Sequence, residues 1–447
     1  MVDSKKTALV RFLGCKVNQA EAAAMARLLS QHGYETPDKE AKPDLVLVNT
    51  CAVTSRAESK SRRLVKHLAQ AFPSARIVVT GCLAEVNPGA LTGLDGSITV
   101  LGTFEKDRLD SLLTDTLSPG VTRRGAAHCT TYGDIGCAGL TSRGRAFLKI
   151  QDGCSQRCSY CIVPHARGPS RSLSETHVIG HAQLLAAQGY GEIVLTGVHL
   201  GHYGRDLTPR SDLEAVLRRL LAHIPHVRFR LSSIEPQDLT PGIIALAAEH
   251  PRMCRHFHIP VQSGDDRILA AMGRPYTHSF VADLLARLQT AIPDVCIGLD
   301  VMVGFPGEDT DAFLATEQLI GASRAAYLHV FPFSPRRGTP AALLRPVVPA
   351  DAVRERVAHL RAMSLGMRRE FQKKFIGRTL MCVAETPVRA DGSLIARTDN
   401  YLQVRVRVPE AFQSARMFPV RLTGFRGGSM EGELAEESTE AAPAWQA

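Results

Sequence analysis

The sequence has 447 residues, of which 45% are hydrophobic and 22% are charged, and its net charge is +9. This length exceeds that of an ordinary single domain, and the balanced composition excludes a fibrous or low-complexity chain. No stretch approaches the ~20 apolar residues that span a bilayer, and the first residues lack the apolar core and cleavage site of a signal peptide. We therefore expect a cytoplasmic protein of two or three domains.

Residues 1–135 are predicted to form a first domain in which short apolar strands alternate with helices. Strands are expected at 8–13, 45–49 and 76–80, and helices at 19–31 and 56–71. This βαβαβ order predicts a parallel sheet covered by helices. The Gly/Thr/Arg-rich stretch 118–145 has no regular period, so we expect a linker there.

Residues 136–350 are predicted to form a second α/β domain. Six strands are expected in series, at 146–150, 192–198, 228–234, 256–262, 296–305 and 326–333. The stretches between them are long enough for crossover helices, as at 175–188, 213–222 and 280–290. Six strand–helix repeats predict a partial (β/α)6 barrel, in which an active site lies at the carboxyl ends of the strands.

The C-terminal part is predicted to begin with a basic linker helix at 351–375. Strands near 379–385, 402–408 and 417–422 then predict a small β-barrel over residues 376–434, and residues 435–447 are expected to be a disordered tail. Residues 352–427 hold 15 Lys and Arg but only 6 Asp and Glu. Such a basic region suits a nucleic acid, although a solvated basic surface explains it equally well.

A group of three cysteines, Cys154, Cys158 and Cys161, follows the first expected barrel strand with C-x3-C-x2-C spacing. Cytosolic cysteines stay reduced, which favours metal binding over disulfides. Three thiolates on one loop can hold a [4Fe–4S] cluster and leave its fourth iron open. Zinc is the alternative, with His165 as a fourth ligand.

A second group, Cys15, Cys51 and Cys82, is scattered in the sequence, but each lies at the end of an expected strand of the first domain. Carboxyl ends of parallel strands meet at one edge of a sheet, where ligands bind. We therefore predict a second three-cysteine cluster site. The alternative is that each cysteine is a small buried hydrophobe.

Several of these motifs resemble known families. The C-x3-C-x2-C group, with Tyr160 before its last cysteine, resembles the radical-SAM signature. Together with CKVNQ, VNTCAVT, RLSSIEP and HIPVQSG, it resembles the methylthiotransferase family, and within it the branch that acts on threonylcarbamoyladenosine. The sequence AEAAA after CKVNQ and His202 in GHYG depart from the family pattern, but neither touches a candidate cluster ligand.

The resemblance implies a fold, cofactors and a reaction. It implies an N-terminal domain with the second cluster, a radical-SAM barrel and a C-terminal TRAM-like RNA-binding barrel. The implied cofactors are two [4Fe–4S] clusters and S-adenosylmethionine, whose reductive cleavage gives a 5′-deoxyadenosyl radical. The implied reaction converts N6-threonylcarbamoyladenosine at position 37 of tRNA to its 2-methylthio derivative.

The resemblance also implies partners. These are the tRNA anticodon loop, an electron donor such as a flavodoxin or ferredoxin, and a sulfur donor of unknown identity. Two alternatives stay open for the substrate: isopentenyladenosine of tRNA, or an aspartate of a ribosomal protein. A third alternative, from another class, is a non-catalytic RNA-binding protein stabilised by closed four-ligand metal sites.

Two further groups of residues are candidates for binding. Predicted contacts to S-adenosylmethionine are Tyr160, Gly197, Glu235, Gln262 and Gly304, which except for Tyr160 lie at expected strand ends. Predicted contacts to RNA are Arg378, Arg397, Tyr401, Arg405 and Arg407 in the basic C-terminal region. Each residue also has an ordinary explanation as part of a turn, a packing contact or a basic surface.

Overall fold

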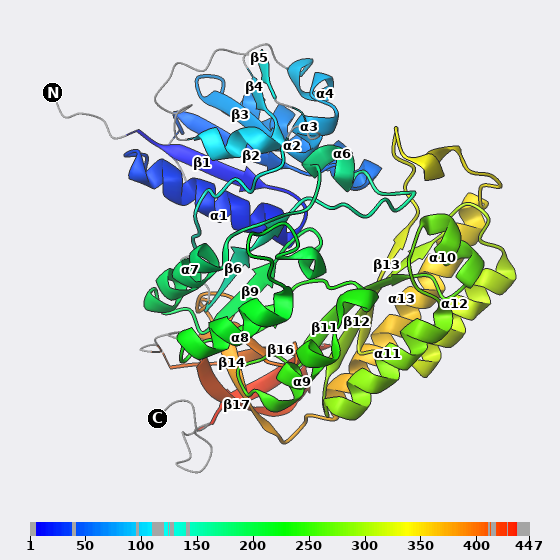
Figure 1. Ribbon diagram of the computed structural model, residues 1–447. Coiled ribbons are helices and arrows are strands. Elements are labelled where there is room, and N and C mark those ends of the chain that lie inside the picture. Colours follow the sequence, from blue (N-terminus) through cyan, green and yellow to red (C-terminus); the bar gives the residue numbers. More distant parts are fainter. Residues whose placement is uncertain are drawn as a thin grey trace.

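Three structural units make up the computed structural model, which is shown in Figure 1. It describes residues 6–37, 42–94, 98–109, 120–123, 125, 129–139, 144–409, 412, 417–426 and 428–435. The expected tail, apart from Ala435, and part of the expected linker at 118–145 lie outside the described residues. Among the helices in the described ranges, none has the length and apolar character needed to cross a membrane.

The N-terminal unit is a parallel sheet in which the strands lie side by side in sequence order. Its strands are β1 (Ala8–Phe12), β2 (Leu45–Thr50), β3 (Arg76–Gly81), β4 (Thr99–Leu101) and β5 (Gly120–Thr122). Its helices are α1 (Lys16–Gln31), α2 (Ser55–Ala71), α3 (Cys82–Val86) and α4 (Gly89–Thr92), followed by a 3-10 helix at Thr103–Arg108. The predicted parallel sheet is confirmed. Strand β5 lies within the stretch expected to be a linker and gave no signal there, since three exposed residues are too few to show a strand pattern.

The central unit contains all six predicted strands. They are β6 (Arg145–Lys149), β9 (Glu192–Thr196), β10 (Arg228–Leu231), β11 (His256–Gln262), β12 (Cys296–Val303) and β13 (Tyr327–Pro332). Two parallel three-stranded sheets, β6-β9-β10 and β11-β12-β13, are joined through single bridges such as Ser233 to His258. The predicted open, partial barrel is therefore confirmed.

Helices cover the central strands, as Figure 1 shows. They are α7 (Glu175–Ala187), α8 (Leu213–His223), α9 (Pro241–Glu249), α10 (Asp266–Met272), α11 (His278–Ala291) and α12 (Thr310–Ala322). A Ser, Thr or Asp side chain caps the first turn of each by accepting a backbone N–H bond. Between β6 and α7, the chain forms the short hairpin β7 (Gln151–Asp152) and β8 (Arg171–Ser172), with α6 (Val163–Arg167) inside it.

The C-terminal unit begins with the predicted basic helix, α13 (Ala350–Lys373), which packs on β12 and β13. A closed barrel follows, with strands β14 (Thr379–Ala384), β15 (Ser393–Thr398), β16 (Gln403–Arg407), β17 (Met417–Arg426) and β18 (Ser429–Leu434). The small barrel is confirmed, but it has five strands where the sequence pattern gave three. Strand β15 was missed because its polar residues Ser393, Arg397 and Thr398 are buried.

The alanine-rich helix α1 joins the N-terminal sheet to the central barrel. Ala20 packs against Phe147 of β6 and Val194 of β9. Small side chains let the helix approach the barrel closely, which gives the unusual AEAAA sequence a physical reason. Glu21 lies in the same interface and is 1% exposed.

Glu21 is the centre of a buried ionic network between the two units. Its carboxylate accepts hydrogen bonds from Arg167 (2.9 Å), Lys149 (2.8 Å) and Lys106 (2.5 Å). Arg167 and Lys149 also bind Asp152, each at 2.8 Å. Burial alone would raise the pKa of Glu21, but these cations hold that pKa well below its usual value. The network is therefore ionised, and it ties residues from both units into one cluster.

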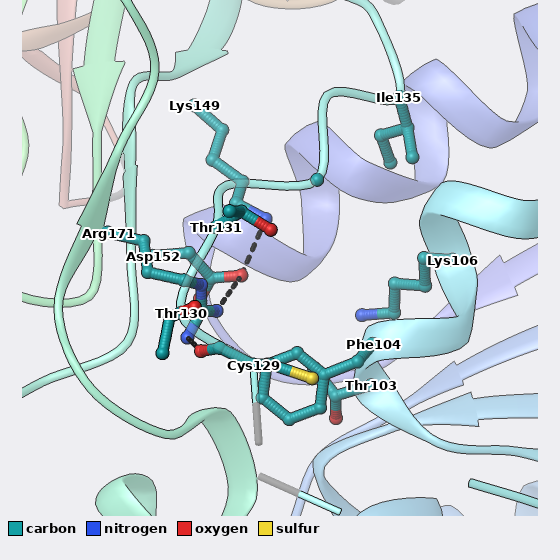
Figure 2. Close-up of a pocket in the computed structure, with 11 residues that line it drawn as sticks. Thr103, Phe104, Lys106, Cys129, Thr130, Thr131, Ile135, Lys149, Asp152 and Arg171 are labelled. Carbon is teal, nitrogen blue, oxygen red and sulfur yellow. Dashed lines mark hydrogen bonds and ion pairs between the residues drawn. The ribbon is translucent and has the colours of Figure 1, made fainter. Parts of the chain in front are cut away.

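Figure 2 shows one side of this network, where Lys149 and Arg171 meet Asp152. Lys106 reaches toward them from the N-terminal unit. The guanidinium of Arg171 stacks on the ring of Phe104, with the guanidinium carbon 4.8 Å from the ring centroid. The cavity between these side chains is small, about 100 Å³. Its cations are already paired, so we assign this region a structural role.

We predict that Glu21→Ala destabilises the protein by about 3–5 kcal/mol, because three buried cations lose their shared carboxylate. The free energy of unfolding, measured by urea denaturation, checks this. Glu249→Ala, at the exposed end of α9, is the matched control and should change stability by less than about 0.5 kcal/mol. An equal loss of unfolding free energy in the two variants would contradict the structural role assigned to the Glu21 network.

Candidate active site

The loop between β7 and α6 carries Cys154, Cys158 and Cys161. It is anchored to α10, because Ser159 donates its backbone N–H to Met272 (2.9 Å) and its hydroxyl to Ala271 (2.7 Å). All three cysteines lie on this one short loop, and burial, together with the neighbouring thiols, raises the pKa of Cys161 to about 12. The structure thus brings the three predicted ligands into one group.

Two polar side chains, His199 and Arg274, orient this cysteine group. His199 Nδ1 lies 3.4 Å from Cys154 Sγ, and Arg274 Nη1 lies 3.3 Å from Cys158 Sγ. The other ring nitrogen of His199 bonds to Asp238 at 2.7 Å. Burial alone would lower the pKa of His199, but the bonds to Asp238 and Cys154 raise it to about 9. Residues that hydrogen-bond to metal ligands commonly fix the orientation of those ligands.

His199 and Arg274 were missed in the sequence. His199 follows a strand in GVHLG, which is the one signal that pointed to it. Arg274 follows α10, outside any strand end, and only the fold brings it to the cysteines. Both contacts are therefore tertiary features.

The predicted contacts to S-adenosylmethionine occupy different surroundings. Glu235 is ion-paired with Arg274 and so lies beside the cysteine group. Gln262 is buried at the end of β11 in the left-handed region (φ 70°), and its Oε1 has no hydrogen-bond partner among the described residues. A strained, buried residue with an unpaired polar atom fits a ligand contact.

The other three candidates have packing explanations. Tyr160 stacks edge-on against Phe305, with ring centroids 6.5 Å apart. A Cβ on Gly197 would lie 2.8 Å from Gln151 Oε1, and one on Gly304 would lie 2.5 Å from Val353 of α13. These glycines are therefore required by neighbouring protein atoms, and their contact with the cofactor stays a prediction.

The second cysteine group lies at the carboxyl edge of the N-terminal sheet, as the strand-end argument predicted. Cys15 precedes α1, Cys51 follows β2 and Cys82 begins α3, and all three line one cavity. Burial, together with Cys82, raises the pKa of Cys51 to about 12. Arg167 Nε, from α6 of the central unit, donates to Cys82 Sγ at 3.4 Å. The ionic network and this cysteine group therefore share one arginine.

Glycine permits the close approach of two of these cysteines. Gly14 has φ 104°, and a Cβ there would lie 2.7 Å from the Cβ of Cys51. Gly81 has φ 100°, and a Cβ there would lie 2.4 Å from the carbonyl oxygen of Thr50. A side chain at either position would push the strand ends apart.

The cavity next to the second cysteine group has a volume of about 620 Å³. It extends from the cysteines past the ends of β9 and β10 to polar side chains of β11, β12 and β13, and to Tyr401. His258 Nε2 binds Asp300 at 2.8 Å, and His329 Nδ1 lies 3.4 Å from the same oxygen. Asp300 and His329 are register partners in neighbouring strands. The cavity thus joins a thiol group to a polar pocket.

The first cysteine group borders another cavity, of about 610 Å³, which Cys154, His165 and Glu85 help to line. Helices α3 and α6 pack against each other between these features. Cys82 begins α3, and Cys161 lies two residues before α6. One helix pair therefore links the two cysteine groups.

The donor sets fit iron–sulfur clusters with one open iron. Each group offers three sulfur atoms, and each has a cation nearby that offsets thiolate charge, Arg274 or Arg167. His165 is exposed and, within the described ranges, its side chain makes no hydrogen bond or ion pair. Two incomplete tetrahedral sets do not suit structural zinc, which is held by four ligands.

The predicted RNA contacts divide into exposed and buried residues. Arg378 and Arg407 are exposed, and Arg405 pairs with Asp391 at the surface. Arg397 differs from the expectation: it is 9% exposed and binds Glu385 (2.6 Å). Tyr401 lines the cavity, stacked on His256 with centroids 4.0 Å apart, instead of lying on the outer surface.

Comparison with known proteins matches two parts of the chain to family models. Residues 7–102 match the uncharacterized protein family UPF0004, and residues 148–320 match the radical SAM superfamily. The chain is 36% identical to the threonylcarbamoyladenosine tRNA methylthiotransferase MtaB of Bacillus subtilis, over 88% of each protein. The MtaB of Rickettsia prowazekii is 32% identical, over 94% of this chain and 95% of the relative.

This chain belongs to the radical-SAM methylthiotransferase family. A second group of relatives is represented by the tRNA-2-methylthio-N(6)-dimethylallyladenosine synthase of Desulfitobacterium hafniense, 30% identical over 87% of this chain and 88% of the relative. The protein is thus a radical-SAM enzyme, and the cofactors of that superfamily are a [4Fe–4S] cluster and S-adenosylmethionine.

Solved structures support the fold of this family member. The radical S-adenosylmethionine methyltransferase TsrM from Kitasatospora setae, bound to tryptophan and aza-SAM, has a TM-score of 0.56 and 18% identity. The match covers 76% of this chain and 75% of TsrM. Such a likeness concerns the arrangement of the domains alone.

We predict that His199→Ala loosens the radical-SAM cluster, because Cys154 loses the donor that orients it. Iron release to a chelator under anaerobic conditions should become roughly tenfold faster. His223→Ala, at the exposed end of α8, serves as control and should release iron at the wild-type rate. Indistinguishable release from the two variants would show that His199 does not support the cluster.

Proposed function

We propose that this methylthiotransferase converts N6-threonylcarbamoyladenosine at position 37 of tRNA to its 2-methylthio derivative. The observation that carries the proposal is the linkage of two three-cysteine groups through α3 and α6, beside one large cavity that has a polar wall. The relatives named MtaB are said to act on threonylcarbamoyladenosine, and they match this chain over most of its length. Residue identities and geometry therefore support the same reaction.

The chemistry of the substrate explains why two metal groups are useful. Carbon 2 of adenine carries an unactivated C–H bond, which has no acidic proton for a general base to remove. S-adenosylmethionine and the clusters, when bound, supply the radical, methyl and sulfur chemistry that the side chains lack. Cys154, Cys158 and Cys161 are proposed to hold the radical-SAM cluster, and Cys15, Cys51 and Cys82 the second cluster.

The protein's own part is to hold and enclose the reactants. Glu21 and Arg167 fix the distance between the two cysteine groups, because they bind residues of both units. Glu235 and Gln262 are proposed to orient S-adenosylmethionine.

One wall of the cavity is polar, and this wall favours threonylcarbamoyladenosine over the dimethylallyl substrate of other relatives. A dimethylallyl group is a hydrocarbon, whereas the threonylcarbamoyl group carries a carboxylate, a hydroxyl and a urea. The cavity wall offers His258, Asp300 and His329, together with two tyrosines. Leaving these polar groups against a hydrocarbon would cost free energy.

The anticodon loop is proposed to reach this cavity between the domains 1–135, 136–350 and 376–434. Exposed arginines such as Arg378 and Arg407 are proposed to contact its phosphates, because they lie on the C-terminal barrel surface. Single-stranded loops can present an unstacked base to such a site. A flavodoxin or ferredoxin as electron donor and a separate sulfur donor complete the proposal.

We predict that Cys154→Ala and Cys51→Ala each remove one cluster, so that iron falls from about eight to about four atoms per chain. Both variants should lose methylthiolation, but only Cys154→Ala should lose reductive cleavage of S-adenosylmethionine. Cys382→Ala, inside the C-terminal barrel, is the control and should keep its iron. Full iron content in Cys51→Ala would contradict the second cluster.

The substrate is tested by a mass-spectrometric nucleoside profile of tRNA from cells with and without this protein. We expect loss of 2-methylthio-N6-threonylcarbamoyladenosine and accumulation of its unthiolated precursor. A change in the isopentenyl derivative instead would leave the reaction type in place and overturn the substrate. An unchanged profile would overturn tRNA as the substrate.

A further inference from the structure

Lys16 is a cation of the large cavity that the reaction, as described so far, does not use. It directly follows Cys15 at the start of α1 and lines the same cavity as the second cysteine group. Within the described ranges its side chain makes no hydrogen bond and no ion pair. The buried lysines Lys106 and Lys149 differ, because both are paired with Glu21. Lys16 is therefore a cavity cation without a protein counter-ion in the described structure.

The charged groups around Lys16 are already engaged with one another. Arg145 and Arg230 both pair with Glu192, which is fully buried. Asp300, the acidic residue of the cavity wall, is bound by two histidines, His258 and His329. The surrounding carboxylates thus have closer partners than Lys16. A cation enclosed in this way is stabilised when a ligand supplies an anion.

A second observation also indicates a polar ligand in this cavity. Ser232, at the end of β10, is 3% exposed, and its Oγ has no hydrogen-bond partner among the described residues. It lines the same cavity as Lys16. A buried hydroxyl is rarely left without a partner unless a ligand or water supplies one. The cavity therefore offers a charged donor and an unsatisfied hydroxyl.

We propose that Lys16 binds the carboxylate of the N6 substituent and thereby selects threonylcarbamoyladenosine over substrates with a hydrocarbon substituent. This inference rests on the proposed function, because the threonyl group is the part of that nucleoside that carries a carboxylate. Tyr401, from the C-terminal barrel, faces the same space and lies beside Arg230 and Arg397. The pocket is thus lined by residues of all three units, with Lys16 from the N-terminal unit, Ser232 from the central unit and Tyr401 from the C-terminal barrel.

The test measures RNA binding by the cluster-loaded enzyme under anaerobic conditions and without S-adenosylmethionine, so that no other carboxylate competes. The probes are two fluorescent anticodon stem-loops, one with threonylcarbamoyladenosine and one with its methyl ester. For the wild type, we expect the ester to bind about tenfold more weakly, since a charge-assisted hydrogen bond is lost. Lys16→Met should weaken binding of the acid loop about tenfold and that of the ester loop less than about twofold.

Two further variants separate charge from structure. Lys16→Arg keeps the cation and should retain most of the preference for the acid loop. Lys60→Met removes an exposed lysine of α2, away from the cavity, and should keep wild-type affinity for both loops. Iron content and cluster absorbance are measured for every variant, because Lys16 adjoins Cys15.

Two outcomes would overturn the inference. One is equal affinity of the wild type for acid and ester loops, a result that needs no variant and so does not depend on folding. The other is an equal loss for both loops in Lys16→Met, which would assign Lys16 to an RNA phosphate. Failure of the proposed function is seen separately, as absence of methylthiolation when wild-type enzyme, S-adenosylmethionine and reductant are added to the acid loop.

Discussion

The buried pairing of Glu21 with Arg167 is the constraint on which the site depends. Glu21 lies on α1 of the N-terminal unit and Arg167 on α6 of the central unit, and both are about 1% exposed. Arg167 also donates to Cys82, so the same side chain fixes the interface and touches a candidate cluster ligand. Two ions buried at an interface are stable only in a narrow geometry. The position of one cysteine group relative to the other follows from that geometry.

The remaining features of the site extend from this interface. Alanines on α1 let the N-terminal sheet lie against β6 and β9, and the strand ends of both units then enclose one cavity. The C-terminal barrel completes the cavity by contributing Tyr401, whose left-handed backbone (φ 69°) is unusual outside glycine. All three units therefore contribute residues to this one cavity.

Much of this fold and part of the site could be predicted from the sequence. The strands of the central barrel are short apolar runs that end in polar loops, so the local sequence pattern predicts all six of these strands. The spacing of Cys154, Cys158 and Cys161 is likewise a local signal. His199, Arg274 and Arg167 gave little or no such signal, because they reach the cysteines only through tertiary packing. Arg397 differs from the expectation for the converse reason: composition counts a charge, but it does not show that the charge is paired with Glu385 inside the protein. Strand β15 was missed because buried polar residues hide the usual alternation.

The most direct test of this account is an anomalous diffraction map, recorded at the iron absorption edge, from crystals of the anaerobically prepared enzyme. We predict two iron peaks, one beside Cys154, Cys158 and Cys161 and one beside Cys15, Cys51 and Cys82, with the Glu21–Arg167 pair between the two units intact. A single peak, or a signal at either site that appears only at the zinc edge, would contradict the claim that two iron–sulfur clusters meet at this interface.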